Sequence, residues 1–282
     1  MKTNKNKYLS CKDYLVTNQQ FDLLYNEELD MLETYPVPSL DKLPSYYKSE
    51  DYISHTDSSK TLFDKVYQFV KRININNKLK LINSLEKEEN KILDIGCGTG
   101  DFLNACKKNN YKVFGVEPNE KANSIASEKI GEDVFKNLDD IIETQFDVIT
   151  LWHVLEHVPN LQEYISKIKN LLKPNGILII AVPNFNSFDA NYFKQFWAAF
   201  DVPRHLWHFS KKAITSIFLK HQINLVKIIP MKFDAYYVSI LSDKNKNKKS
   251  NFIKAICIGW WSNFKAKRSK EYSSLIYVLK NS

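Results

Sequence analysis

The sequence predicts an α/β fold with a doubly wound, mostly parallel sheet of seven strands, a small N-terminal appendage, and insertions after the fifth and sixth strands. Two observations carry this prediction. From about residue 60 onward, short apolar runs alternate with stretches of helical periodicity. The first apolar run, Lys91 to Ile95, breaks into a turn with three glycines, which is typical of a buried strand that ends against a ligand. With 282 residues, 44% of them apolar, the chain can form one large domain or one domain with a small appendage.

The N-terminal part differs in pattern from the rest of the chain. Residues 1–59 mix aromatic and acidic residues with prolines and show no clear helical or strand period, so we expect an appendage rather than a core. From Thr61, apolar residues recur at helical spacing and predict an amphipathic helix before the first strand. The predicted division is therefore 1–59 for the appendage and 60–282 for the α/β domain.

Seven strands and three helices are then expected in order. The strands are 91–95, 112–117, a weak strand near Val134 and Phe135, 146–152, 176–182, 223–229 and 273–279. The helices between them are expected at about 100–109, 119–130 and 161–172. Segments 184–210 and 231–271 lie outside this alternation. Because such sheets bind ligands beyond the carboxyl ends of their strands, these insertions are where a substrate pocket would be built.

The glycine turn limits the class of ligand. Gly96, Gly98 and Gly100 are spaced by two, whereas a dinucleotide site has the spacing G-x-G-x-x-G. Asp94, at the end of the first strand, would repel a phosphate but suits a ligand with an ammonium group near a sulfonium. Glu117 ends the second strand about 20 residues later, where a carboxylate can accept both hydroxyls of a ribose. The two carboxylates bracket the two ends of one nucleoside ligand, and S-adenosylmethionine has these features.

On these residues the chain resembles the class I S-adenosylmethionine-dependent methyltransferases, over roughly residues 60 to 230 and more weakly to the C-terminus. The resemblance implies a Rossmann-like fold whose last two strands form an antiparallel pair at the edge of the sheet. The residues that it assigns to the cofactor are Asp94, Gly96, Cys97, Gly98, Gly100, Glu117, Pro118, Trp152 and His153.

A first candidate for chemistry follows the fourth strand, where the sequence reads Trp-His-Val-Leu-Glu-His. If this segment is helical, His153, Glu156 and His157 share one face and can bind a metal or hold a proton acceptor. The segment resembles the acid-x-x-Glu-His signature of ubiquinone-biosynthesis-type O-methyltransferases, in which the trio is associated with a divalent cation, but histidine here replaces the first acid. Three roles stay open: a structural turn under the cofactor, a general base at His153 or His157 with His205 as a rival, and a metal site.

A second candidate lies in the insertion 184–210. Aromatic residues recur at every fourth position from Phe188 to Phe200, which indicates either core packing or a pocket. A D-x-P-R-H element follows, similar to one in a branch of bacterial methyltransferases with this core. The residues that this resemblance assigns to the acceptor are Trp197, Arg204, His205 and His208. Arg204 would pair with an anionic group of the substrate; the alternative is a structural salt bridge between Asp201 and Arg204.

The N-terminal appendage departs from that same branch. There, a small four-cysteine zinc module often precedes the core, and residues 8–31 resemble its remnant with only Cys11 left. Zinc is therefore not expected. The four cysteines of the chain form no C-x-x-C pair, so neither a disulfide framework nor a zinc ribbon is predicted.

Charge and hydropathy bear on partners and compartment. The formal net charge is +8, but the basic residues are interpreted as scattered except for the lysine run at 244–249, so no strong nucleic-acid signal is inferred. After that run, the apolar residues of 251–264 recur with a period near 3.6. This aromatic helix would either pack over the sheet edge or let 244–264 contact a membrane or a lipid-like acceptor. No signal sequence or membrane span is recognised, and the cytoplasm is the expected compartment.

The sequence therefore predicts an S-adenosylmethionine-dependent methyltransferase that acts on a small molecule, preferentially at oxygen. One alternative is an RNA or protein methyltransferase, against which stand the scattered charge and the absence of an N/D-P-P-[YF] motif. The other is a cofactor-binding regulatory protein without catalysis. The acceptor, the use of a divalent metal and the oligomeric state stay open.

Overall fold

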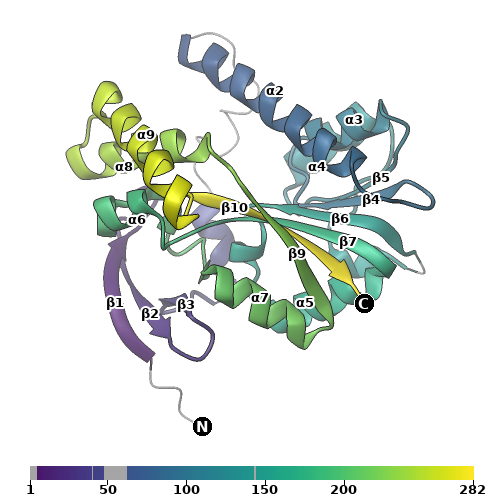
Figure 1. Cartoon of the computed structure of the whole chain (residues 1–282), viewed down its shortest axis with the longest axis horizontal. Helices are drawn as coiled ribbons and strands as arrows, with labels where there is room; N and C mark the ends of the chain where they lie inside the picture. Colours follow the sequence, from purple (N-terminus) through teal and green to yellow (C-terminus); the bar gives the residue numbers. More distant parts are fainter. Residues whose placement is uncertain (1–4, 40, 48–61, 143) are drawn as a thin grey trace.

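A computed structural model gives the fold of residues 5–39, 41–47, 62–142 and 144–282. Its central sheet has six strands in the order β5-β4-β6-β7-β10-β9 (Figure 1). These strands are β4 (Lys91–Ile95), β5 (Lys112–Val116), β6 (Phe146–Trp152), β7 (Leu172–Pro183), β9 (Ile223–Pro230) and β10 (Ser274–Asn281). The first four are parallel, and β10 is antiparallel to both β7 and β9. The antiparallel pair at the edge is confirmed.

The expected seventh strand is absent from the described sheet. Near Val134 and Phe135 there is one isolated parallel bridge, between Val116 and Phe135. Helix α4 (Glu120–Ile130) ends at Gly131, and a capping box at Asn137 starts the short helix η2 (Leu138–Asp140). Between these two ends only this bridge joins the described sheet, so six strands are observed there and the seventh is not confirmed.

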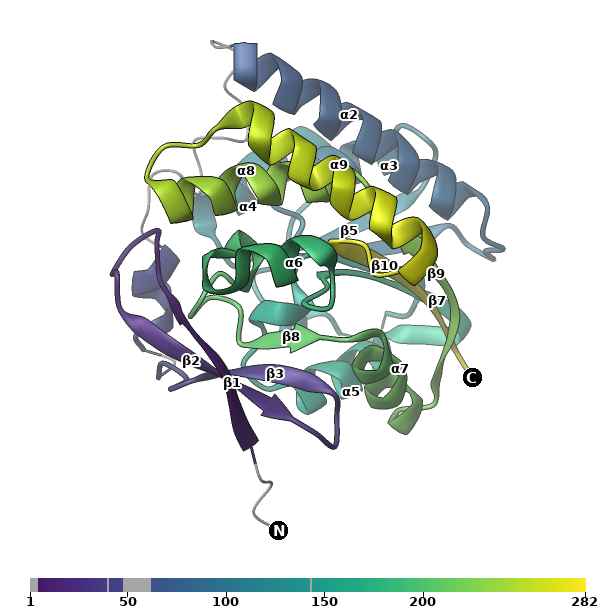
Figure 2. The same ribbon diagram turned by 60° about the vertical axis from the view of Figure 1, so that its left-hand side comes forward.

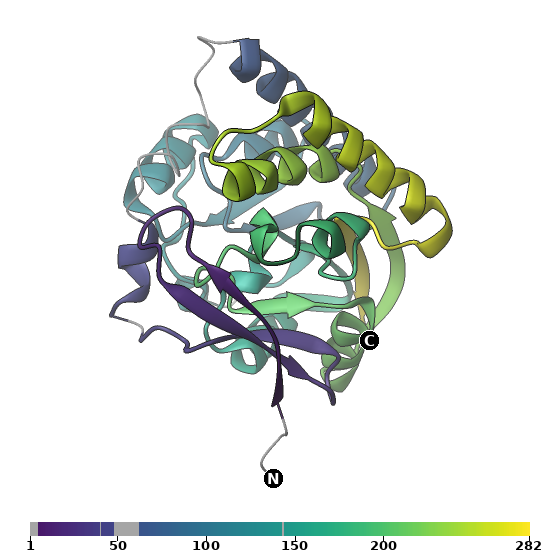
Figure 3. The same ribbon diagram turned by 90° about the vertical axis from the view of Figure 1, so that its left-hand side faces the viewer.

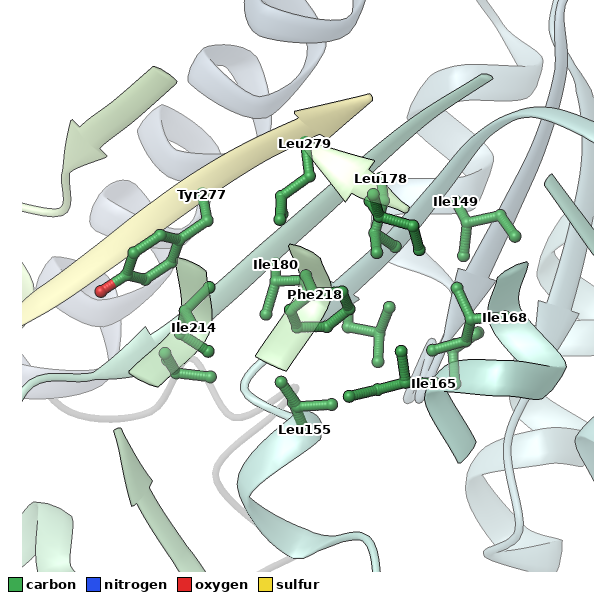
Figure 4. Close-up of a cluster of buried hydrophobic side chains, with 14 of the residues drawn as sticks. Ile149, Leu155, Ile165, Ile168, Leu178, Ile180, Ile214, Phe218, Tyr277 and Leu279 are labelled. Atoms are coloured by element: carbon green, nitrogen blue, oxygen red, sulfur yellow. The ribbon is translucent and has the colours of Figure 1, made fainter. Parts of the chain in front are cut away.

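Helices cover both faces of the sheet because neighbouring residues of a strand point to opposite faces. On one face pack α2 (Leu62–Asn83), α3 (Asp101–Lys107) and α4; on the other pack α5 (Leu161–Leu171) and α7 (Lys211–Lys220). Leu178 and Ile180 of β7 join the α5 and α7 side, where Figure 4 shows them with Ile165 and Phe218. Ile179, between them, faces the other side. The helices expected at 100–109, 119–130 and 161–172 are thus confirmed with small shifts of their ends.

The first part of the chain is more regular than its sequence suggests. β1 (Lys5–Lys12), β2 (Gln20–Asn26) and β3 (Met31–Tyr35) form an antiparallel meander, and β8 (Trp207–Phe209) completes a second sheet in the order β1-β2-β3-β8. Of these four strands, β8 comes from the insertion 184–210 and the others from the N-terminal part. Figure 3 shows this four-stranded sheet below the helices of the two insertions. The sequence showed no clear strand period here, and one of the four strands, β8, comes from a segment far along the chain. The predicted boundary at 59/60 lies outside the described residues.

The two insertions form helices over the carboxyl ends of the parallel strands. The first contains α6 (Phe188–Phe193) and the short helices η4 (Lys194–Phe196) and η5 (Ala198–Phe200). The second contains α8 (Asp234–Asn247) and α9 (Phe252–Ser269), which lie side by side (Figures 2 and 3). The buried carboxylate of Asp189 ties these parts together, because it accepts hydrogen bonds from Trp197, Ser262 and Ser273 at 2.6–2.8 Å. None of the described helices has both the length and the hydropathy that a membrane span requires.

Candidate active site

The glycine turn leaves β4 with a backbone that only glycine adopts easily. Gly96, Gly98 and Gly100 all have positive φ, at 70°, 55° and 74°. A Cβ on Gly96 would lie 2.4 Å from the Val154 side chain, so the loop after β6 packs directly on the turn. A Cβ on Gly98 would meet nothing within 4 Å. The turn therefore presents backbone toward open space, as a ligand cradle requires.

Two carboxylates flank the turn, as predicted from their strand ends. Glu117 accepts hydrogen bonds from the backbone N–H groups of Gly98 and Asn119, each at 2.9 Å, so the turn itself positions it. Asp94 is buried and accepts a hydrogen bond of 2.6 Å from the Thr150 hydroxyl. Burial raises the pKa of Asp94 to about 7, although Thr150 and a nearby ammonium oppose the shift. Burial makes the ionised form of Asp94 costly when no positive charge is near. A cationic ligand group beside it would therefore stabilise the ionised carboxylate strongly.

That nearby ammonium belongs to Lys78, a site residue that the sequence analysis missed. Helix α2 carries it over the ring of Trp152, with Nζ 4.1 Å from the ring centroid. Burial lowers the pKa of Lys78 to about 8, against the opposing effect of Asp94. Lys71, seven residues earlier on the same helical face, pairs with Asp101 at 2.6 Å at the start of α3. The sequence carried no signal for Lys78, because its place over Trp152 depends on how α2 packs on the sheet.

The remaining residues assigned to the cofactor lie around this turn but differ in exposure. Cys97 is half-buried, and burial raises the pKa of its thiol. Pro118 is exposed beyond Glu117. The buried Trp152 Nε1 has no hydrogen-bond partner among the described residues, so its N–H group is available to a ligand.

His153 stands at the end of β6, in a left-handed backbone conformation with φ at 58°. Its ring lies between two acids: Nδ1 is 3.4 Å from Glu156 Oε1, and Nε2 is 3.3 Å from Asp234 Oδ2. Burial disfavours the charged ring, but these two carboxylates outweigh it and raise the pKa of His153 to about 10. At neutral pH this imidazole is protonated and cannot accept another proton.

Glu156, His157 and His205 form the second part of the site, and their ligand atoms lie within 4.8 Å of one another. This set differs from the expected trio, because the segment after β6 forms the short helix η3 (Leu155–His157), and the β8 loop brings His205 in place of His153. Leu206 N–H donates to the Glu156 carbonyl at 2.8 Å and fixes that loop. Both carboxylate oxygens of Glu156 are buried without a hydrogen-bond partner among the described residues.

The rings of His157 and His205 lie beside this carboxylate. His157 Nδ1 is 3.0 Å from the Arg204 carbonyl, and His205 Nδ1 is 2.9 Å from the Ala199 carbonyl. The Ala199 carbonyl can only accept, so His205 Nδ1 carries a proton and His205 Nε2 has a free lone pair. His157 Nδ1 also lies 3.0 Å from the Tyr47 hydroxyl, which can donate or accept. His205 Nε2 lies 4.0 Å from Glu156, and the two rings are 4.5 Å apart. Burial and His205 lower the pKa of His157 to about 4. The Glu156 carboxylate, which also pairs with His153, and these two imidazoles fit a divalent cation or a transferred proton.

Arg204 is not free for a substrate. Its guanidinium is buried and donates to Asp201, at 2.6 and 3.0 Å, to Asp13 at 3.0 Å, and to the Tyr46 carbonyl at 3.1 Å. The salt bridge between Asp201 and Arg204, the alternative of the sequence analysis, is present, and a third partner from the N-terminal sheet joins it. The expected pairing of Arg204 with an anionic substrate is corrected, because every side of the guanidinium fork is already occupied.

The other residues assigned to the acceptor lie in the core. Trp197 is buried and donates to Asp189. His208, also buried, lies 3.1 Å from the Thr34 hydroxyl, and burial lowers its pKa well below the ordinary range. Of the aromatic repeat only Phe200 joins the buried cluster with the N-terminal sheet, together with the neighbouring Phe193 and Trp197, whereas Tyr192 is exposed. Cys11 is buried in the same cluster.

Comparison with known proteins is consistent with this geometry. The model of a family described as "Methyltransferase domain" matches residues 66–228. The chain is similar to the ubiquinone biosynthesis O-methyltransferase of Rhodopseudomonas palustris strain TIE-1, at 28% identity over 171 residues, which cover 55% of this chain and 65% of that protein. It is also similar to the ubiquinone biosynthesis O-methyltransferase of Histophilus somni, at 34% identity over 109 residues, 34% of this chain and 46% of that protein. The chain spans less than two thirds of the length of these relatives.

A solved structure supports the fold. The magnesium protoporphyrin IX methyltransferase of Synechocystis, crystallised with bound SAH, superposes with a TM-score of 0.56. The alignment covers 86% of this chain and all of that chain, at 15% identity. At this identity the likeness shows the α/β architecture of the chain.

Proposed function

The chain belongs to the methyltransferase-domain family, and from that membership we propose that it transfers a methyl group from S-adenosylmethionine to an oxygen of a small-molecule acceptor. One observation carries the cofactor part of the proposal: the carboxylates of Asp94 and Glu117 stand on either side of a glycine turn that faces open space. The similarity to ubiquinone biosynthesis O-methyltransferases supports oxygen as the acceptor atom.

Each polar end of the cofactor has a partner in this arrangement. Glu117 accepts the two ribose hydroxyls. Asp94 attracts the α-ammonium group of the methionine part of the cofactor. Lys78 Nζ pairs with the carboxylate of that same methionine part. The Trp152 ring, which lies under Lys78, forms an apolar wall beside the methionine chain. His153 and the histidine pair lie just beyond the end of β6, where the acceptor would meet the methyl group of a bound cofactor.

The second part of the site supplies the chemistry of the acceptor. Methyl transfer depends mainly on holding the acceptor oxygen in line with the sulfonium methyl group. When that oxygen is a hydroxyl, its proton must leave, and we assign its removal to the imidazoles of His157 and His205, of which His205 has a free lone pair at Nε2. Glu156 then stabilises the imidazolium that forms. His153 is the less suitable base, because Asp234 and Glu156 already keep it protonated.

A divalent cation held by Glu156, His157 and His205 would supply Lewis-acid chemistry that acidifies the acceptor hydroxyl. The residues present fit this role, because the Glu156 oxygens are buried without a hydrogen-bond partner among the described residues. The proposal for the histidine pair stands without the cation.

The experiment has a binding step and a transfer step. Calorimetry with S-adenosylmethionine should show binding by the wild-type chain and much weaker binding by Asp94→Asn and by Glu117→Gln. Absence of binding by the wild type would overturn the proposal. Incubation with methyl-tritiated donor and cell extract should then place label in the small-molecule fraction, and His157→Ala with His205→Ala should remove it.

The fraction that carries the label separates the alternatives. Label in acid-precipitable RNA or protein would show a macromolecular methyltransferase instead. Tight cofactor binding without labelled product in any fraction would favour a regulatory protein.

A further inference from the structure

The basic residues that give the chain its net positive charge are concentrated in one segment. The sequence had been interpreted as having scattered basic residues apart from the lysine run at 244–249. The segment from Lys244 to Lys270 contains nine of the 40 lysine and arginine residues and none of the 32 acidic residues. The remaining chain, with 31 basic and 32 acidic residues, has a formal net charge of −1. The acids that border the segment are held elsewhere: Asp243 is buried, and Glu271 pairs with Lys211 at 2.6 Å. The second half of α8 and all of α9 therefore carry the net charge of the molecule.

Helix α9 turns its small residues inward. The residues that it buries are Ala255, Ile258, Gly259, Ser262 and Ala266. A Cβ on Gly259 would lie 2.8 Å from the Ala235 carbonyl oxygen, so α8 and α9 pack backbone against backbone. This close packing uses a face of α9 on which Ile258 is the one large side chain among small residues.

The large apolar residues of α9 point to solvent instead. Ile253 is 76% exposed, Trp260 55% and Phe264 48%. The Phe264 ring stacks on both neighbouring indoles, at 5.6 Å from Trp260 and 5.3 Å from Trp261. Lys265 lies over Trp261, and Lys267 lies over Phe264. We call this surface, formed by Ile253, Trp260, Trp261, Phe264, Lys265 and Lys267, the α9 outer face.

We propose that the α9 outer face docks the protein on an anionic lipid surface. Indole and phenyl rings prefer the interface between headgroups and acyl chains, and lysines beside them bind anionic headgroups. A helix of 18 residues with an apolar outer face and flanking lysines has the form of an interfacial helix that lies parallel to the membrane. The acid-free segment 244–270 matches the negative surface potential of such a membrane.

Two other occupants fit the α9 outer face less well. Single-stranded RNA stacks its bases on open aromatic faces, but here the rings stack on one another, and the most exposed apolar residue is the aliphatic Ile253. A second copy of the chain would bring two acid-free basic segments together, which is electrostatically unfavourable.

The α9 outer face is also connected to the candidate active site. Asp234, the first residue of α8, contacts His153, and α9 packs along α8 (Figure 2). Docking would therefore hold the site close to a surface in which apolar acceptors dissolve. This last consequence rests on the proposed function; the docking itself does not.

Vesicle flotation of the full chain tests the proposal without any methyl donor. We expect binding to vesicles of phosphatidylcholine mixed with phosphatidylglycerol, weak binding to phosphatidylcholine alone, and release by salt. The double variant Trp260→Ala with Phe264→Ala, and the double variant Lys265→Glu with Lys267→Glu, should each lower the partition coefficient about tenfold or more. Matched controls elsewhere on the surface, Leu219→Ala and Lys220→Glu with Lys227→Glu, should bind like the wild type.

Several outcomes would overturn the docking proposal. Equal binding to both kinds of vesicle would show that anionic headgroups are not recognised. Full binding by both double variants would show that the α9 outer face is not the docking surface. If the wild type retains RNA in a filter assay, the two double variants do not, and no vesicle binding is seen, then the α9 outer face binds nucleic acid instead. A concentration-dependent dimer that the Trp260→Ala and Phe264→Ala variant abolishes, again with no vesicle binding, would assign it to a second copy. Circular dichroism of each variant separates loss of binding from loss of fold.

Discussion

His153 shows how the identity of single residues sets the electrostatics of this site. It leaves β6 with a positive φ and holds its protonated ring between Glu156 and Asp234. Burial opposes a charge on Glu156, yet the neighbouring imidazoles lower its pKa to about 2. Because His153 stands where the resemblance leads one to expect an acid, its positive charge balances part of the negative charge of Glu156 and Asp234.

The pairing of His153 predicts a pH dependence of stability. Its pKa is about 10 in the folded state against 6.5 ordinarily, so the imidazolium stabilises the fold fully below pH 6.5. As pH rises from 6.5 through 10, the folded chain must give up that proton and the stabilisation is lost. The difference in free energy of unfolding between wild type and Asp234→Asn, measured by urea titration, should therefore shrink over this range. A difference that stays constant from pH 6 to 10 would contradict the assignment.

Lys78 predicts a specific loss of cofactor affinity. A charge-assisted pair with the cofactor carboxylate contributes roughly 1.5–3 kcal/mol, so Lys78→Ala should raise the dissociation constant of S-adenosylmethionine at least about tenfold. Lys80 is an exposed residue on the same helix, so Lys80→Ala serves as the control and should leave the dissociation constant of S-adenosylmethionine unchanged. Calorimetry measures both, and equal affinities for the two variants would remove Lys78 from the site.

At the scale of elements, the N-terminal sheet is fastened to the α/β domain by contacts that cross long stretches of sequence. β3 pairs with β8, and Thr34 donates to the His205 carbonyl at 2.6 Å. Arg204 joins Asp13 to Asp201 within this contact. Because the same loop carries His205 into the site, the N-terminal sheet supports the position of a candidate proton acceptor.

The buried ion pair predicts a large effect on stability. Arg204→Met should lower the free energy of unfolding by about 3 kcal/mol, because Asp201 and Asp13 lose a charged partner in a buried place. Arg268→Met, on the exposed side of α9, removes the same charge and should change it by less than about 0.5 kcal/mol. Urea titration gives both values. Equal stability of the two variants would show that the sheet is held by its apolar contacts alone.

At the scale of the whole molecule, the candidate cofactor site joins elements that are separate in the sequence. Helix α2, the β4 turn, the end of β5 and the end of β6 each contribute one side of it. A ligand that bridges these elements stabilises the folded state relative to the unfolded chain by mass action.

This linkage predicts a thermal shift. At a concentration about 100 times its dissociation constant, S-adenosylmethionine should add about 2.7 kcal/mol to the stability. For a domain of this size, roughly 2–4 °C of Tm corresponds to each kcal/mol, so the midpoint should rise by several degrees. Lys78→Ala at the same ligand concentration should show a smaller rise. A wild-type Tm that does not respond to the ligand would contradict the assigned site.

The sequence by itself determined the features that depend on neighbouring residues. The alternation of apolar runs and helical periods predicted the parallel strands and their helices, and the glycines with Asp94 and Glu117 predicted where the cofactor would bind, because a strand end and its turn are local. Only the tertiary structure decided contacts between distant residues: β8 against β3, Arg204 against Asp13 191 positions away, and Lys78 over Trp152. It also decided which way α9 faces. A helical period shows that one face is apolar, but the depth available beside Ala235 selects the small residues for the interior and leaves the aromatic rings outside.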